Sequence, residues 1–191
     1  ADGLELYFSG FLGGTGRVRP GGYGHSDLWV TRRATRNDLW GPPENLGGVV
    51  NSEYQDARPF LSADSLVLLF DSERLGTHDE GDLYITRRAT RSSPWGPPVN
   101  LGSPINTPFF EEDACLSPDG ATLYWDCDRP NGYGRFDIWQ APILPIVDFN
   151  GDRNVGAEDL AMLSEDWGWN ESVCDIGPYA WGDGIVDEQD L

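Results

Sequence analysis

The chain has 191 residues, a formal net charge of −19, and thirteen arginines with no lysine. This acidic balance argues against nucleic acid and anionic membrane surfaces as partners, because phosphate binding needs clustered positive charge. No run of about eighteen apolar residues occurs, so the sequence predicts no membrane span.

An internal repeat dominates the segment 1–141. The tripeptides Asp-Leu-Trp, Asp-Leu-Tyr and Asp-Ile-Trp begin at Asp27, Asp82 and Asp137, with a constant period of about 55 residues. The segment 31–36 reappears unchanged as 86–91, and 40–47 returns with one substitution as 95–102. This register indicates one structural unit copied along the chain.

Each copy is predicted to contain four short strands. In the second copy the expected strands are 57–61, 66–71, 82–88 and 95–101. The last is edge-like, because its two prolines fit only an edge or a bulge. Four short strands with Gly-rich turns are typical of a propeller blade. We therefore predict an all-β fold, a partial β-propeller of four-stranded blades with two nearly complete repeats and part of a third.

The turn and strand pattern of the third copy carries a family resemblance. Ser117-Pro118-Asp119-Gly120 precedes a strand at 123–125, and a loop then leads to the strand at 136–139. This pattern resembles the WD40-like repeat of TolB-type propellers, over residues 1–141. The resemblance implies the fold and says little about activity. The chain begins inside a predicted strand, which favours the C-terminal part of a larger propeller over a complete small all-β domain.

Charged residues at equivalent positions of the repeats are expected to be structural. The arginine pairs at 32–33 and 87–88 favour ion pairs between blades over an anion site. Three polar loops, 17–26, 73–81 and 129–136, could line a ligand-binding face, and an aspartate follows each of them. An Asp in this place in every blade is expected to cap backbone N–H groups rather than to catalyse hydrolysis.

The three cysteines give little information. Cys115 and Cys127 flank a tight turn at unequal distances from it. In the hairpin the two residues would therefore lie several positions out of register, too far apart for a disulfide. Cys174 could pair with one of them or with a cysteine elsewhere. Zinc is not expected, because the chain has no Cys-x-x-Cys spacing.

A twelve-residue loop at 148–159 predicts a Ca²⁺ site. Side-chain oxygens occupy loop positions 1, 3, 5 and 12, which are Asp148, Asn150, Asp152 and Asp159. Position 7, Asn154, offers a backbone carbonyl. These are the offsets at which such a loop wraps a hard cation. The prolines at 142 and 145 argue against a helix before the loop, and apolar residues at 160, 163 and 167 predict a helix after it. The alternative is an acidic, solvated loop.

A second, distorted loop ends at Asp190. Asp183, Asp187 and Asp190 fall at positions 5, 9 and 12, and Ile185 offers its carbonyl at position 7. Asp175 can serve as position 1 if residues 177–180 are partly an insertion. The alternative is a degenerate loop that holds only water.

Two such loops, each leading into a helix with no entering helix, resemble a dockerin type I module. The resemblance implies attachment of a secreted protein to a cohesin partner. The chain ends at Leu191, where the second helix would begin, so the module is expected to be truncated. Positions 10 and 11 of the loops, at 157–158 and 188–189, lack the small hydroxyl pair on which cohesin recognition rests. The expected organisation is propeller repeats at 1–141, a linker at 142–147 and the calcium module at 148–191.

Two functions fit these features. In the first, the chain is a secreted, extracellular bacterial calcium-binding protein. Its propeller would recognise a carbohydrate or peptide ligand, and its module would attach to a cohesin-like or cell-surface protein. In the second, it is the non-catalytic C-terminal part of an extracellular polysaccharide-degrading enzyme, since dockerin modules most often accompany glycoside hydrolases. The sequence contains no recognisable catalytic constellation, so an enzymatic role is not predicted from it.

Overall fold

The computed structural model describes residues 2–12, 17–76, 81–143, 157 and 161. Contacts within the chain divide it into two compact units, Ala1–Pro142 and Ile143–Leu191. In the second unit the described residues are Ile143, Ala157 and Ala161, and both alanines are helical and exposed. Among the described residues, no helix is long and apolar enough to cross a membrane.

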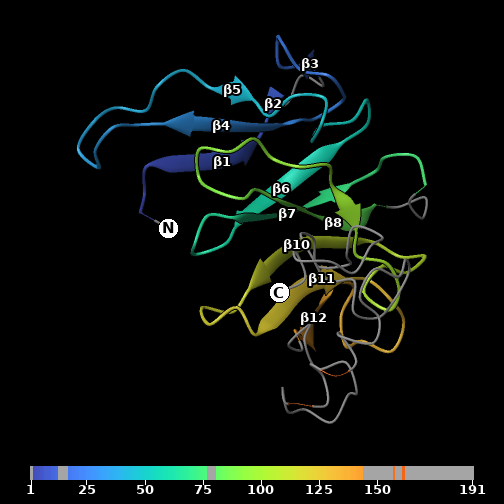
Figure 1. Ribbon diagram of the computed structural model, residues 1–191. Coiled ribbons are helices and arrows are strands. Elements are labelled where there is room, and N and C mark those ends of the chain that lie inside the picture. Colours follow the sequence, from blue (N-terminus) through green and yellow to red (C-terminus); the bar gives the residue numbers. More distant parts are fainter. Residues whose placement is uncertain (1, 13–16, 77–80, 144–156, 158–160, 162–191) are drawn as a thin grey trace. The chain divides into compact units, whose positions relative to one another are not determined.

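The first unit is all-β in its described part, as predicted, and its strands pair antiparallel in every sheet (Figure 1). The first sheet has the order β1-β4-β5, the second β6-β7-β8-β9, and the third β10-β11-β12, and β2 and β3 form a separate pair. The strand bounds are β1 Glu5–Ser9, β2 Phe11–Leu12, β3 Arg17–Val18, β4 Leu28–Arg32, β5 Glu44–Asn45, β6 Asp56–Leu61, β7 Val67–Ser72, β8 Asp82–Arg87, β9 Val99–Asn100, β10 Glu111–Leu116, β11 Thr122–Cys127 and β12 Asp137–Pro142.

The repeat of the sequence is a repeat of strands in space. β6, β7 and β8 reappear as β10, β11 and β12, each exactly one repeat period later and with the same length. The registers agree too, since Asp56 faces Ser72 in the second sheet as Glu111 faces Cys127 in the third. Repeating hydrophobic and turn residues therefore produce repeating sheets.

The predicted fourth strand is shorter than expected. The sequence predicts a strand at 95–101, whereas β9 covers only Val99–Asn100. Pro97 and Pro98 lack the N–H groups that a longer ladder needs, so pairing begins after them. The second sheet has four strands, and the first and third have three each in the described part of the chain.

The three sheets pack face to face through two apolar layers. In β7, Leu68 and Phe70 belong to the core shared with the first sheet, while Leu69 belongs to the core shared with the third. Successive side chains of a strand point to opposite faces, so a strand buried on both sides reads as a continuous apolar run. Contacts between neighbouring sheets concentrate on β1, β6, β7 and β10 rather than on the last strands. Sheets that approach most closely at one edge are blades of a partial β-propeller.

Buried polar side chains fasten each blade to the turn that follows it. Asn51 donates to the carbonyl of Leu28 and accepts from its N–H, at 3.1 and 2.8 Å. Asn106, at the equivalent position of the next repeat, makes the same two bonds to Leu83 at 3.0 and 2.9 Å. The amide thus pairs the buried N–H of the strand residue and adds a second donor to its carbonyl, which also accepts from the N–H of Leu46 in the first case and of Leu101 in the second.

Cys115 and Cys127 form no disulfide with each other, as predicted, and both are free thiols. The register of the third sheet pairs Cys115 with Tyr124 and Cys127 with Glu111, which separates the two cysteines along the ladder. Cys174 lies outside the described residues.

Candidate functional site

All the residues predicted to bind calcium, from Asp148 to Asp190, lie outside the described residues. Among the residues that the structure does describe, no group of three or more His, Cys, Asp or Glu side chains is arranged to hold a metal ion. The candidate site described below therefore belongs to the propeller blades and was not predicted from the sequence.

Two of the three aspartates that follow the polar loops cap backbone N–H groups, as expected, while the third, Asp82, accepts from Nδ2 of Asn100 at 2.6 Å. Asp27 accepts hydrogen bonds from the backbone N–H groups of Tyr23 and Gly24, at 2.7 and 3.0 Å. Asp137 accepts from the N–H of Gly134 at 3.1 and 3.2 Å to its two oxygens. Carboxylates engaged in this way hold the loop closed against the strand.

The arginine pairs have several roles, and only one of the four arginines joins two blades. Arg88, which follows β8, donates to Glu5 of β1 at 2.6 Å, as predicted for a blade-to-blade ion pair. Arg32 instead binds Glu5 and Glu44 of its own sheet. Burial of Glu5 works to raise its pKa, but the hydrogen bonds from Arg88 and Arg32 hold this pKa below its ordinary value.

Of the other two arginines, Arg33 binds the backbone and Arg87 is desolvated. Arg33 donates to the carbonyl of Gly3 at 2.9 Å and stacks over the ring of Trp40. Burial lowers the pKa of Arg87, with Asp64 acting in the opposite direction. The prediction of blade-to-blade pairs is therefore correct for Arg88 and wrong for Arg32 and Arg33, which bind cross-strand or backbone acceptors of the first blade. Arg87 forms no ion pair with another blade among the described residues.

A large hollow lies between the first and second sheets. It has a volume of about 540 Å³, and its walls include Arg32, Arg88, Arg91 and Trp95. The three guanidinium groups already bind carboxylates, Arg32 and Arg88 as described above and Arg91 on Asp2. The groove is therefore lined by ion pairs that are complete within the chain, and it offers little free charge to a ligand.

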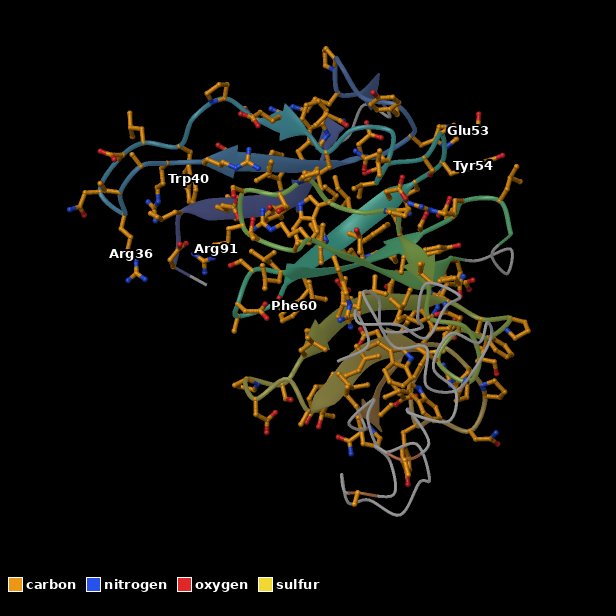
Figure 2. The ribbon with its side chains drawn as sticks, in the orientation of Figure 1. Arg36, Trp40, Glu53, Tyr54, Phe60 and Arg91 are labelled. Atoms are coloured by element: carbon orange, nitrogen blue, oxygen red, sulfur yellow. The ribbon has the colours of Figure 1, made fainter. Side chains whose placement is uncertain are left out.

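A second hollow lies near the opposite end of the sheets. Figure 2 shows Trp40 and Arg91 toward one end, and Glu53 and Tyr54, which lead into Gln55, toward the other. This second hollow is a cavity of about 60 Å³. Its lining comes from the second and third sheets and consists of Gln55, Arg58, Asp71, Glu73, Gly81, Phe110, Glu111 and Glu112.

A β-bulge in each of the two sheets builds this second site. The register of β6 shifts between Ala57 and Phe60, and that of β10 shifts between Glu112 and Cys115. Within the bulges, Arg58 and Asp113 have left-handed backbones with φ of 50° and 54°. Such a conformation is uncommon for residues other than glycine, and bulges often redirect a side chain beside a functional site.

Arg58 gathers three carboxylates from two blades, and we call these four residues the Arg58 cluster. Its Nη1 donates to Asp71 Oδ2 at 2.9 Å within the second sheet. Its Nη2 lies 2.7 Å from Glu112 Oε2, and its Nε lies 3.7 Å from Asp113 Oδ2, both in the third sheet. The planar guanidinium can serve several acceptors at once because its five donors point in fixed directions.

Asp71 is the most strongly perturbed group of the cluster. Its side chain is only 6% exposed, and its Oδ1 has no hydrogen-bond partner among the described residues. Burial raises the pKa of Asp71 to about 7, against the lowering effect of Arg58 and with a further rise from Glu112 and Asp113. A carboxyl group with this pKa exchanges its proton near neutral pH.

Neighbouring carboxylates are perturbed in the same direction. Burial raises the pKa of Glu112, and Asp113, Asp126 and Asp128 add to the rise while Arg58 opposes it. Burial also raises the pKa of Asp126, which pairs with Glu112 across the ladder, and Asp113 adds to this rise. One guanidinium therefore neutralises only part of the negative charge collected here.

Two aromatic rings lie beside the acidic groups. Phe110 forms part of the cavity wall and is 36% exposed. The ring of Phe136 lies 6.4 Å from it, between centroids, in a tilted arrangement. The lining of the cavity thus combines carboxylates with the partly exposed ring of Phe110.

Comparison with known proteins assigns no family. No family model matches the sequence, and none of the curated proteins matches it. Among solved structures, a thermostable family-43 glycoside hydrolase is similar with a TM-score of 0.41 and 16% sequence identity. The match covers 63% of this chain and 45% of that chain, so the chain spans less than half of the hydrolase. A likeness at this level carries no assignment of function.

Proposed function

We propose that this chain belongs to an extracellular calcium-binding protein in which the propeller blades form a recognition scaffold and the C-terminal segment forms an attachment module. The observation that carries the proposal is the loop 148–159, where five oxygen donors occupy the positions that a Ca²⁺ ion requires. The distorted second loop, which ends at Asp190, supports a paired module of the dockerin kind. Such a module would bind a cohesin-like or cell-surface protein.

The recognition role of the blades is supported by the Arg58 cluster. Blades packed through two continuous apolar layers form a rigid support, and binding sites are commonly placed on the loops and edges of such supports. In this chain the bulges of β6 and β10 bring charged groups of two blades together beside a cavity. A carbohydrate or peptide ligand on this surface is part of the proposal.

Calcium titration of the chain tests the attachment module. Calorimetry and Trp fluorescence are both suitable, because Trp167, Trp169 and Trp181 are close in sequence to the two loops. We expect at least one site that saturates at or below millimolar Ca²⁺. Asp148→Ala and Asp152→Ala should abolish it, because each removes a ligand from a loop with few alternatives.

The control for this titration is an exposed carboxylate outside the loops. Glu44→Gln changes the net charge by the same amount as either loop variant, and it should leave the calcium isotherm unchanged. If wild type and Asp148→Ala bind calcium equally, the binding is diffuse attraction to an acidic chain and the proposal fails. A chain extended beyond Leu191 should be titrated in parallel, to include the segment predicted to form the second helix.

A second candidate function follows from the same module. Dockerin-like loops most often accompany polysaccharide-degrading enzymes, so the chain would then be a non-catalytic C-terminal part of an extracellular glycoside hydrolase system. The sequence of the whole polypeptide distinguishes the two. A catalytic domain upstream favours the second candidate, and additional propeller repeats alone favour the first.

A further inference from the structure

We propose that the first blade binds an extended acidic segment of another polypeptide, which adds a strand to the free edge of β1 and places a carboxylate against Arg19. This inference rests on the proposed recognition role of the blades. It names a peptide as the ligand and gives the chemistry that the peptide must have. It does not depend on calcium binding by the C-terminal segment.

An arginine over two aromatic rings recurs in all three blades. Arg19, Arg74 and Arg129 fall one repeat period apart. Each guanidinium carbon lies 4.6 to 5.6 Å from the centroids of two rings that pair across neighbouring strands. These ring pairs are Phe8 with Trp29, Phe70 with Tyr84, and Trp125 with Trp139. The three arginines therefore occupy equivalent places in the three blades.

In the second and third blades this arginine also binds a carboxylate. Arg74 donates to Asp56 Oδ1 at 2.6 Å, and Arg129 donates to Glu111 Oε1 at 3.1 Å. Each arginine donates as well to a main-chain carbonyl of the segment that leads into the acidic residue. Both acidic residues are buried, and each is the first residue of its strand, β6 or β10. A carboxylate at the start of the first strand is thus the regular partner of this arginine.

Arg19 has no such partner in the described part of the chain. The interactions described for its guanidinium are those with the two rings. Residues 13–16, which lie outside the described part, contain no carboxylate. The first sheet has the order β1-β4-β5, so it also lacks a described counterpart of β6 and β10. Arg19 is partly buried, and a carboxylate placed against it would form a charge-assisted hydrogen bond.

The strand β1 presents the backbone groups that an added strand needs. Among the described strands it pairs with β4 alone. The carbonyl of Leu4 and the N–H of Gly10 bond toward the side of β4. Backbone groups alternate in direction along an antiparallel strand, so those of Glu5, Tyr7 and Ser9 face the free edge. An extended peptide can add to such an edge through main-chain hydrogen bonds.

The packing of the neighbouring blade is compatible with an added strand. In the second sheet, β6 occupies the matching edge of β7, while β10 of the third blade contacts both β6 and β7. In the first sheet, β6 likewise contacts β1. A strand on β1 would therefore take the place relative to β6 that β6 itself takes relative to β10.

The two occupied copies define the sequence of the partner segment. Both contain a branched aliphatic residue, an asparagine and a hydroxyl residue, with an acidic residue four positions after the hydroxyl residue. The hydroxyl residues, Ser52 and Thr107, donate to this acidic residue from the backbone N–H and from the hydroxyl group. The described segments with this pattern, 50–56 and 105–111, already complete their own blades. We therefore assign the strand on β1 to another polypeptide with the same pattern.

The test is fluorescence anisotropy with the whole chain and a labelled peptide that has the sequence of residues 50–62, the segment that completes the second blade. We expect saturable binding, weakened about tenfold in Arg19→Met and about tenfold when the peptide instead carries Asp56→Asn. The two losses should not add, because both changes remove the same ion pair. Arg135→Met, at an exposed loop position, changes the charge by the same amount and should leave binding unchanged. The peptide variant tests the ion pair without altering the fold of the chain.

Hydrogen exchange followed by NMR separates strand addition from a contact of side chains alone. The peptide should slow exchange of the amides of Glu5, Tyr7 and Ser9, which would gain partners on the free edge. Unchanged exchange at these three amides would show that the peptide does not add to β1 and would overturn the proposal.

The remaining outcomes are equally decisive. Absence of binding by wild type overturns the proposal, and so does equal binding of the two peptides or of a peptide with the same residues in scrambled order. A chain extended before residue 1 that no longer binds the peptide would show that a segment of the same polypeptide fills the edge, which overturns the assignment to another polypeptide. Calcium titration in parallel keeps the two proposals apart. Calcium binding without peptide binding overturns this inference alone, whereas peptide binding without calcium binding overturns only the attachment module.

Discussion

Arg58 and Asp113 occupy the same position in successive blades, and their side chains meet at 3.7 Å across the interface between the blades. Both have left-handed backbones, so the two bulges have been retained while the charge at the position changed sign. The same bulge in two successive blades thus places a positive and a negative side chain in one cluster. The consequence is a local ion pair between two copies of a single structural unit.

Replacing Arg58 should destabilise the propeller unit. Arg58→Met keeps the length and apolar stem of the side chain but leaves Asp71 and Glu112 without their cation. We expect a loss of about 2 kcal/mol in the free energy of unfolding at pH 8, because a mostly buried carboxylate becomes unpaired. Urea unfolding followed by Trp fluorescence measures it. Arg135→Met, at an exposed loop position, should change the free energy of unfolding by less than about 0.5 kcal/mol.

Asp71 should make stability depend on pH in a defined window. Its pKa is raised from 3.8 to about 7 in the folded chain, so the folded state binds the proton more tightly than the unfolded state does. This contribution to stability is complete below pH 3.8 and is lost as pH rises through 7. Between these values the free energy of unfolding of wild type should fall by about 2 to 4 kcal/mol relative to Asp71→Asn.

The difference between the two proteins is the quantity to measure for Asp71. Glu5 and Asp64 have lowered pKa values, so their contributions to stability are lost at acid pH, in the opposite sense. These contributions are present in both proteins and cancel in the difference. Denaturant midpoints collected from pH 4 to 8 suffice. A difference that does not change with pH would mean that Asp71 is ionised throughout.

The repeat and the fold could be predicted from the sequence because they depend on regular patterns. Strand positions followed from alternation and turns, and their copies fell one repeat period apart as expected. The Arg58 cluster was missed because a bulge breaks that alternation, and because its carboxylates come from different strands of two blades. A column-by-column comparison of the repeats would have shown Arg58 at the position of Asp113, which is the one signal that the sequence offers. The burial of Asp71 becomes visible only once the blades are packed.

The buried asparagines should be essential to blade stability. Asn106 donates to and accepts from the backbone of Leu83, and it also donates to Asn100 Oδ1 at 2.7 Å. Asn106→Ala leaves the buried N–H of Leu83 unpaired, while the Leu83 carbonyl still accepts from the N–H of Leu101 at 3.0 Å, so we expect a loss of about 1 to 3 kcal/mol. Asn51→Ala should cost a similar amount, because its bonds show the same pattern in the preceding repeat. Thermal unfolding of both variants tests this, with Asn37→Ala, at an exposed loop position, as the control. A loss of less than about 0.5 kcal/mol in both would contradict it.

The ion pair between Arg88 and Glu5 joins the first two blades. Its coupling free energy should be larger than that of an exposed Arg–Glu pair between neighbouring strands. Arg88 is nearly fully buried and stacks over Trp95, and its partner Glu5 is 15% exposed. A double-mutant cycle with Arg88→Met and Glu5→Gln should give a coupling of about 2 kcal/mol. The matched cycle with Arg32→Met and Glu44→Gln should give about 0.5 kcal/mol, because both of those side chains are exposed to solvent. Equal couplings would show that burial at the blade interface adds nothing to the pair.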